Sequence, residues 1–172
     1  MLESIVESFM LGPILLYDGV CGLCNRLVQF VLQRDRAGVF RFASLQSDIA
    51  TRILARHGAD ERDLDTIYVV LDYDTTDERL VARSDAVVFI LRHLRAADLS
   101  SAHRALRPGP TQISASTQGS LFWRVTGMLL QTIPRVLREW GYRVVARNRY
   151  RIFGRYDTCP LPTENTRERF LG

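Results

Sequence analysis

The sequence predicts a mixed α/β fold in which a pair of cysteines lies where the first strand meets the first helix. Three observations lead to this prediction. Strand-like and helix-like patterns alternate along the first half of the chain, Cys21 and Cys24 directly follow a short apolar run, and 47% of the 172 residues are hydrophobic. A chain of this length can bury one substantial core and is too short for two, so we expect residues 1–172 to form a single domain.

The first half of the chain is expected to contain two strand–helix pairs. The apolar run 14–17 is typical of a buried strand, and apolar residues then recur at helical spacing until the polar break at 35–38. Residues 39–43 alternate around two phenylalanines as a strand does. Ser47 can cap the helix that follows, and Gly58 can close it.

A hairpin and a third helix complete the predicted core. The run 67–71 has the β-branched composition of a central strand, and an Asp-rich loop leads to a second strand at 80–82. Ser84 is placed to cap a helix from Asp85 to about Leu94. The predicted order of elements is therefore β-α-β-α-β-β-α.

The remaining residues are expected to form an insertion and two helices. We expect the core to occupy 13–96, a flexible insertion without clear periodicity to occupy 97–119, and a helical extension to occupy 120–172. The extension contains helical patterns at 121–133 and 134–146, the second with a proline in its first turn. One face of that second helix carries Val136, Leu137, Trp140 and Val144, and we expect this face to cover the core.

The N-terminus and the cysteine content indicate the compartment. Residues 1–7 carry acids where a secretory signal needs a basic region, and no apolar run reaches the roughly 18 residues of a membrane span. Three cysteines with one close pair do not make a disulfide framework. We therefore expect a soluble, cytoplasmic protein.

Basic charge is concentrated near the C-terminus. The chain carries a net charge of +4, and from Arg135 to Arg155 seven arginines accompany a single acid, Glu139. This stretch could attract phosphates, nucleic acid or an anionic membrane surface, although we favour the simpler interpretation of a solvated helix face. Within it, residues 147–151 could bind an anion, or could fix the helix to the sheet by pairing arginine with carboxylates. No nucleic-acid motif accompanies it, so we expect no nucleic-acid partner.

Cys21, Cys24 and Asp18 are the candidate catalytic residues, and the two cysteines carry the redox chemistry. A helix start exposes unpaired N–H groups and the positive end of the helix dipole, and there the pKa of a cysteine can fall from about 8.5 to roughly 3.5 to 7.5. Three-residue spacing places both sulfurs on one face, with Cys21 outermost. We expect Cys21 to attack a substrate disulfide and Cys24 to resolve the mixed disulfide.

A metal site and an inert pair are the alternatives to redox chemistry. Structural zinc requires four ligands, and no second pair of ligands accompanies these cysteines. We therefore expect no metal and no organic cofactor.

The predicted order of elements resembles the thioredoxin-like core of glutaredoxins, with two additional C-terminal helices. In glutaredoxins the start of the last core helix holds an anionic end of glutathione, so Arg83, Ser84 and Asp85 are candidate substrate-binding residues. An ordinary helix cap is the alternative. Asp18, three residues before Cys21, could accept the proton of the thiol or could receive N–H bonds in the tight turn.

The sequence also resembles the DCC family of thiol-disulfide oxidoreductases, named for an Asp-x-x-Cys-x-x-Cys signature that Asp18, Cys21 and Cys24 match. The resemblance covers 13–95 and 134–160. The matching stretches are 17–25, 40–47, 83–86, 146–150, 153–154 and Cys159. The resemblance implies a thioredoxin-like fold and a thiol-redox role without naming a substrate.

One feature departs from the wider thioredoxin fold. Those proteins place a cis-proline before the third core strand, but no proline occurs here between Pro13 and Pro108. The loop that holds a peptide or glutathione backbone in those proteins must therefore be built differently.

These observations lead to two functional hypotheses. The first is a thiol-disulfide oxidoreductase that acts on a protein or small-molecule thiol or disulfide and is recycled by a separate reductant. The alternative is a non-catalytic module that docks a protein or membrane partner through its arginine-rich C-terminal helix. We expect Cys159 to be accessory and buried as a small apolar residue.

Overall fold

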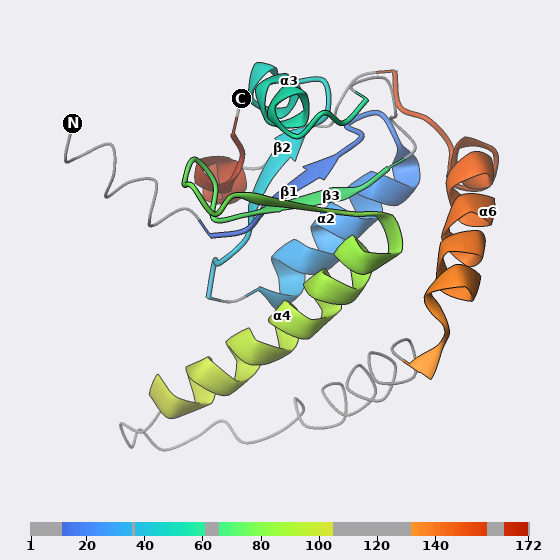
Figure 1. Cartoon of the computed structure of the whole chain (residues 1–172). Helices are drawn as coiled ribbons and strands as arrows, with labels where there is room; N and C mark the ends of the chain where they lie inside the picture. The colour runs from blue at the N-terminus through green and yellow to red at the C-terminus, as the bar shows by residue number, and fades with distance from the viewer. Residues whose placement is uncertain (1–11, 36, 61–65, 105–131, 158–163, 172) are drawn as a thin grey trace.

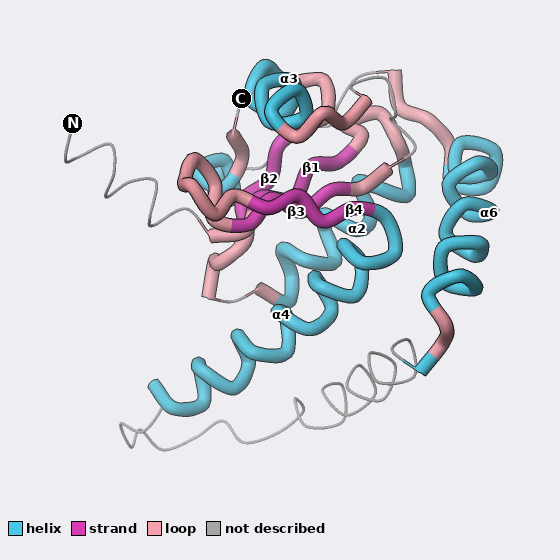
Figure 2. The backbone as a smooth tube through the Cα atoms, viewed as in Figure 1, coloured by secondary structure: helices cyan, strands magenta, loops and turns pink. Residues whose placement is uncertain are grey.

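A four-stranded mixed sheet lies at the centre of the computed structural model, which describes residues 12–35, 37–60, 66–104, 132–157 and 164–171 (Figures 1 and 2). The sheet order is β2-β1-β3-β4; β1 and β2 are parallel, and the other two pairs are antiparallel. The strands are β1 (Ile14–Tyr17), β2 (Arg41–Ser44), β3 (Tyr68–Leu71) and β4 (Arg79–Ala82).

Helices cover both faces of this sheet (Figure 1). Helices α2 (Gly22–Arg34) and α4 (Arg83–Arg104) lie on one face and α3 (Asp48–Arg56) lies on the other. Strand β1 serves both cores, because Leu15 and Tyr17 pack toward α2 and α4 while Ile14 and Leu16 pack toward α3. All four side chains are buried, as expected for a central strand.

The mixed α/β architecture predicted from the sequence is confirmed, and it is consistent with a thioredoxin-like fold. The predicted strand at 14–17 coincides with β1, and Ser47 caps α3 through its hydroxyl, which accepts from the Ala50 N–H. Gly58 follows α3 with a φ of 60°, a left-handed conformation that suits glycine.

Two helices are longer than predicted. Helix α4 continues ten residues past Leu94, into the residues expected to begin an insertion, and α6 (Arg135–Phe153) continues past Ala146. Neither extension contains glycine or proline, the residues that most often end a helix. Helix α6 ends at Gly154, whose φ is 77°. The remainder of the predicted insertion and nearly all of the predicted helix at 121–133 lie outside the described residues.

Helix α6 packs along α2 and α4 at the side of the sheet, as Figure 1 shows. The prediction that Val136, Leu137, Trp140 and Val144 cover the core is wrong, since Val136 is 79% exposed and Trp140 is 67% exposed. The helix instead turns Arg138, Glu139, Tyr142 and Arg149 inward, where they bond to other elements, while Arg135, Arg143, Arg147 and Arg151 are exposed. Its buried residues are Ala146 and Arg149.

The short 3-10 helix η1 (Glu164–Arg169) returns the chain to the edge strand β2. The Leu171 N–H donates to the Phe42 carbonyl at 2.8 Å, and the Phe170 ring stacks on the Phe42 ring with centroids 5.1 Å apart. Arg169 pairs with the buried carboxylate of Asp35. These contacts protect an edge that would otherwise expose unpaired backbone groups.

The outward-facing apolar side of α6 leads to a testable prediction about stability. Trp140→Ala should change the free energy of unfolding by less than about 0.5 kcal/mol, because the side chain is largely exposed. Phe42→Ala should lower it by about 3 to 5 kcal/mol, because that ring is fully buried. Chemical denaturation of both variants measures the difference, and a comparable loss for Trp140→Ala would contradict the observed orientation.

Candidate functional site

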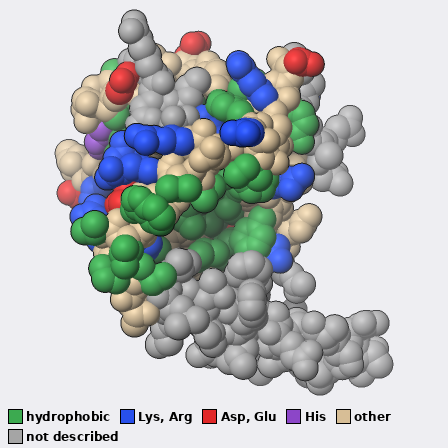
Figure 3. Space-filling view, turned by 90° about the vertical axis from the view of Figure 1, so that its right-hand side faces the viewer, with side chains coloured by type: hydrophobic (Ala, Val, Ile, Leu, Met, Phe, Trp, Pro, Cys, Tyr) green, Lys and Arg blue, Asp and Glu red, His purple; other side chains and the backbone are tan. Residues whose placement is uncertain are grey.

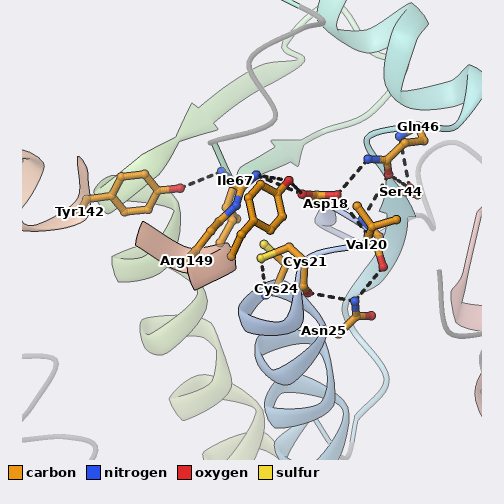
Figure 4. Close-up of polar contacts among 12 residues, drawn as sticks. Asp18, Val20, Cys21, Cys24, Asn25, Ser44, Gln46, Ile67, Tyr142 and Arg149 are labelled. Carbon is orange, nitrogen blue, oxygen red and sulfur yellow. Dashed lines mark hydrogen bonds and ion pairs between the residues drawn. The ribbon is translucent and has the colours of Figure 1, made fainter. Parts of the chain in front are cut away.

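The two cysteines begin helix α2, as the sequence predicted. Cys21 is the N-cap residue, with φ −83° and ψ 123°, and its Sγ accepts from the Cys24 N–H at 3.5 Å. The Asn25 amide holds the turn together, because it donates to the Gly19 carbonyl at 2.7 Å and to the Cys21 carbonyl at 3.0 Å (Figure 4). Both thiols are free.

Neither thiol reaches solvent. Cys21 is 0% exposed and Cys24 is 2% exposed, although Cys21 was expected in the outer position. The backbone after α6 covers Cys21, since residue Arg155 forms an antiparallel bridge with it. Sequence spacing indicated which cysteine lies at the helix start, but it carried no information about a distant segment folding over it.

The two thiols differ sharply in acidity. The Cys24 thiol donates to the Cys21 sulfur and, with the Cys24 backbone N–H and the Arg149 charge, lowers the pKa of Cys21 to about 6 against the opposing effect of burial. The pKa of Cys24 is raised far above its usual range by its hydrogen bond to Cys21, by burial and by the Cys21 charge. These opposite shifts favour a thiolate at Cys21 and a thiol at Cys24 near neutral pH.

Asp18 forms the turn before Cys21 with a fully buried carboxylate. One carboxylate oxygen accepts from the Val20 N–H at 3.1 Å and from the Gln46 amide at 2.9 Å. The other accepts from the Arg149 guanidinium at 3.0 Å and from the Tyr150 hydroxyl. Figure 4 shows Asp18 between Gln46 on one side and Arg149 on the other. The turn role considered from the sequence is thus observed, whereas proton transfer from the thiol stays a prediction.

Arg149 is a residue of the candidate site that sequence analysis had not singled out. It comes from α6, is 2% exposed, and its charge favours the thiolate forms of both cysteines. Of the two roles considered for 147–151, pairing with a carboxylate is the one that Arg149 performs. The sequence signals were its place in the matching stretch 146–150 and in the arginine-rich stretch 147–151. Neither identifies its partner Asp18, which is 131 residues away.

Arg83, Ser84 and Asp85 open α4, and α6 engages two of them directly. The Ser84 hydroxyl and N–H donate to the Glu139 carboxylate, the latter at 3.3 Å. The Asp85 carboxylate pairs with Arg135 and Arg138, each at 2.7 Å. An internal carboxylate thus occupies the helix start that we considered for an anionic substrate. Substrate binding by these three residues stays a prediction, and it requires Glu139 to be displaced.

The loop before β3 is also occupied by α6. The Ile67 N–H donates to the Tyr142 hydroxyl at 2.9 Å, and the Ile67 carbonyl accepts from the Arg83 N–H at 2.9 Å. No cis peptide bond occurs among the described residues. In other thioredoxin-like proteins the backbone at this position would hold a ligand. Here the N–H and the carbonyl of Ile67 are already hydrogen-bonded to other residues of the chain.

The described part of the chain contains neither a candidate metal cluster nor a candidate membrane span. Within it, no cluster of three or more His, Cys, Asp and Glu side chains is suited to hold a metal ion. No helix there is long and apolar enough to span a membrane. Cys159 lies outside the described residues.

Comparisons with known proteins found one matching family model and two relatives more than 30% identical to the chain. A family model for DCC1-like thiol-disulfide oxidoreductase matches residues 15–115. The uncharacterized protein YuxK of Bacillus subtilis is 32% identical over 158 residues, which cover 92% of this chain and 93% of the relative. The DCC family protein At1g52590, chloroplastic, of Arabidopsis thaliana is 34% identical over 149 residues, which cover 87% and 69%. No solved structure matches the chain.

The acidity of Cys21 can be tested by the pH dependence of its alkylation. As the pH falls below about 6 the thiolate is progressively protonated, so the reaction of Cys21 with iodoacetamide should rise through about pH 6 and level off above neutrality. Peptide mapping by mass spectrometry measures each cysteine separately. A profile for Cys21 that rises only near pH 8.5, as for an ordinary cysteine, would contradict this site description.

Arg149→Met should move that profile to higher pH, because it removes the positive charge that favours the thiolate. Arg149→Lys keeps the charge and should restore part of the shift. Arg147→Met is the matched control, since Arg147 lies on the same helix and is exposed. Equal profiles for the two methionine variants would exclude an electrostatic role for Arg149.

Proposed function

The chain belongs to the DCC1-like thiol-disulfide oxidoreductase family, and from this membership we propose that it exchanges thiols and disulfides through Cys21 and Cys24. The observation that carries the proposal is the position of two free thiols at a helix start, where the Cys24 N–H donates to the Sγ of the N-cap residue Cys21. The lowered pKa of Cys21 and the raised pKa of Cys24 agree with it. A thiolate is the attacking species in disulfide exchange, and a partner held as a thiol does not compete with it. We therefore assign Cys21 as nucleophile and Cys24 as resolving thiol.

In the first step the Cys21 thiolate attacks one sulfur of a substrate disulfide. A bond forms between Cys21 and that sulfur, the substrate S–S bond breaks, and the second substrate sulfur leaves as a thiolate. In the second step the Cys24 thiolate attacks Cys21 Sγ, which forms the Cys21–Cys24 disulfide and releases the first substrate sulfur. Two electrons pass from the dithiol to the substrate, and an external dithiol must return them for the next turnover.

The first step itself prepares Cys24 for the second. Two of the three influences that raise its pKa are the hydrogen bond to the Cys21 sulfur and the negative charge there. Both weaken or vanish once Cys21 is in a mixed disulfide, whereas the Arg149 charge and the hydrogen bond from the Asp18 backbone remain. Cys24 then loses its proton to the leaving thiolate, and it becomes nucleophilic only when there is a disulfide to resolve.

Asp18 and Arg149 act in this scheme as positioning residues. Exchange spreads negative charge over the sulfurs, and a buried guanidinium favours that charge without moving during the reaction. The Asp18 carboxylate and the Tyr150 hydroxyl fix the guanidinium in place. This role accounts for the acidic residue of the signature, which as a lone charge would oppose thiolate formation.

A reducing compartment such as the cytoplasm suits this chemistry, because both thiols are free and ready to donate electrons. The reductant that we invoke is a dithiol of the same compartment. The mechanism requires no metal and no organic cofactor, since both electrons come from sulfur.

One observation favours the alternative of a docking module. Figure 3, which views the side that carries α6, shows hydrophobic side chains gathered beside arginines. The exposed apolar residues of this helix are Val136, Leu137, Trp140, Val144, Val145 and Ile152. Such a surface suits a protein or membrane partner. Docking of this kind needs neither cysteine, so substitution of Cys21 separates the two functions.

Cys24→Ser should trap a mixed disulfide between Cys21 and its substrate, because only Cys24 releases it. The experiment is best made with Cys159→Ser as the starting protein, so that two thiols remain. Non-reducing electrophoresis after reaction with a disulfide-containing protein detects the adduct. Cys21→Ser is the matched control and should trap nothing. Equal trapping by both variants would show that the assigned roles are wrong.

A further inference from the structure

The backbone after α6 pairs with the active-site turn in the manner of a β-strand. We call residues 154–156 the strap. The Gly22 N–H donates to the Gly154 carbonyl at 3.1 Å, and the Tyr156 N–H donates to the Val20 carbonyl at 2.8 Å. These two bonds flank Cys21 and Arg155, which face each other in an antiparallel bridge.

This bridge is the non-hydrogen-bonded type, in which facing residues approach most closely. In such a pair the Cα atoms lie about 4.5 Å apart. A disulfide requires Cα atoms about 4.4 to 6.8 Å apart, so a cysteine in the position of Arg155 would have its sulfur within bonding reach of Cys21. The strap therefore places a backbone where the half-cystine of a substrate must come.

Gly22 allows this close approach. A Cβ at this position would lie 2.2 Å from the Phe153 carbonyl oxygen and 3.1 Å from that of Gly154. Both are backbone atoms and cannot rotate away as a side-chain end could. Gly22, the first of the two residues between the signature cysteines, thus has a structural reason to lack a side chain. Its absence makes room for a second backbone beside Cys21.

The strap also explains why a reactive cysteine is 0% exposed. No disulfide can reach Cys21 unless the strap moves, and moving it breaks both flanking hydrogen bonds. A small disulfide cannot replace those bonds, whereas an extended peptide supplies the same N–H and carbonyl groups in the same register. The alternative backbone site, before β3, is closed because Tyr142 already bonds the Ile67 N–H.

We propose that the strap occupies the place of the substrate, and that the substrate is an extended polypeptide whose half-cystine takes the position of Arg155. The substrate pairs antiparallel to residues 20–22, accepts from the Gly22 N–H and donates to the Val20 carbonyl. This inference rests on the proposed thiol-disulfide exchange, and it names the class of disulfide on which that exchange acts. The strap competes with the substrate for the same two backbone groups.

The reacting atoms follow the steps already given. The Cys21 thiolate attacks the peptide sulfur that lies across from it, a Cys21–peptide disulfide forms, and the other sulfur of the substrate leaves as a thiolate. Cys24 then attacks Cys21 Sγ and releases the peptide as a thiol. The strap can return once the peptide has left.

The test uses the reduced full-length Cys159→Ser protein and a synthetic peptide whose single cysteine is joined by a disulfide to thionitrobenzoate. Attack on the peptide sulfur releases coloured thionitrobenzoate. N-methylation of the residue after the cysteine removes the N–H that bonds the Val20 carbonyl, so the second-order rate constant should fall about tenfold, which is about 1.4 kcal/mol of barrier. N-methylation of the cysteine itself is the matched control and should have little effect, because that N–H points away from the pair.

The small disulfide dithiobis(nitrobenzoate) separates the two proposals. If it reacts with Cys21 and the two methylated peptides react at equal rates, the strap inference is overturned while thiol-disulfide exchange stands. If neither it nor the peptide reacts with Cys21, the proposed function itself fails. A selective loss for methylation after the cysteine supports both.

Substitutions in the strap and its partner provide an independent test. Tyr156→Pro removes the N–H that bonds Val20, so alkylation of Cys21 and reaction with the unmodified peptide should both become faster, about tenfold; Tyr156→Ala keeps the N–H and is the control. Gly22→Ala displaces the strap but obstructs the peptide in the same way, so alkylation should become faster and the peptide reaction slower. Faster peptide reaction in Gly22→Ala, or unchanged rates in Tyr156→Pro, would overturn the inference.

Discussion

The buried ion pair between Asp18 and Arg149 is the interaction on which the rest of the site depends. It joins the turn before the first helix to α6 across 131 residues, with both side chains almost entirely removed from water. Removing one partner of such a pair leaves an uncompensated buried charge and typically costs about 3 to 5 kcal/mol. The same contact shapes the turn that presents Cys21, supplies a positive charge beside the sulfurs, and brings the end of α6 to the point where the strap begins.

Helix α6 is attached by polar contacts rather than by its apolar face. Glu139 bonds the start of α4, Tyr142 bonds the loop before β3, and Arg149 bonds the first turn. The first two of these positions, the start of α4 and the loop before β3, are the ones at which the glutaredoxin-like core that the sequence resembles holds a ligand. In this chain α6 bonds to all three positions, and its hydrophobic residues therefore face solvent. The turn 20–22 is the place where a second backbone can pair.

Sequence analysis predicted the parts that local patterns specify and missed those that depend on distant partners. The strand 14–17, the helix start at Cys21 and the Ser47 cap each follow from a few neighbouring residues, and all are observed. The orientation of α6 was predicted wrongly because apolar periodicity normally marks the buried face, whereas here inward-facing charges find partners on other elements. The ion pair of Arg149 and the strap had no local signature at all, since each joins residues more than a hundred positions apart.

The strap and the thiol pair are linked through solvent exclusion. Burial opposes the ionisation of Cys21, and the Cys24 thiol, the Cys24 N–H and Arg149 together outweigh it. A covering that simply opened would admit water, which weakens each of those electrostatic interactions by raising the local dielectric. A peptide that replaces the strap bond for bond keeps the sulfurs dry, so the thiolate meets the substrate disulfide in the same environment in which it was stabilised. The segment that hides Cys21 in the free protein is therefore a guide to the shape of the substrate backbone, because both must seal the same turn.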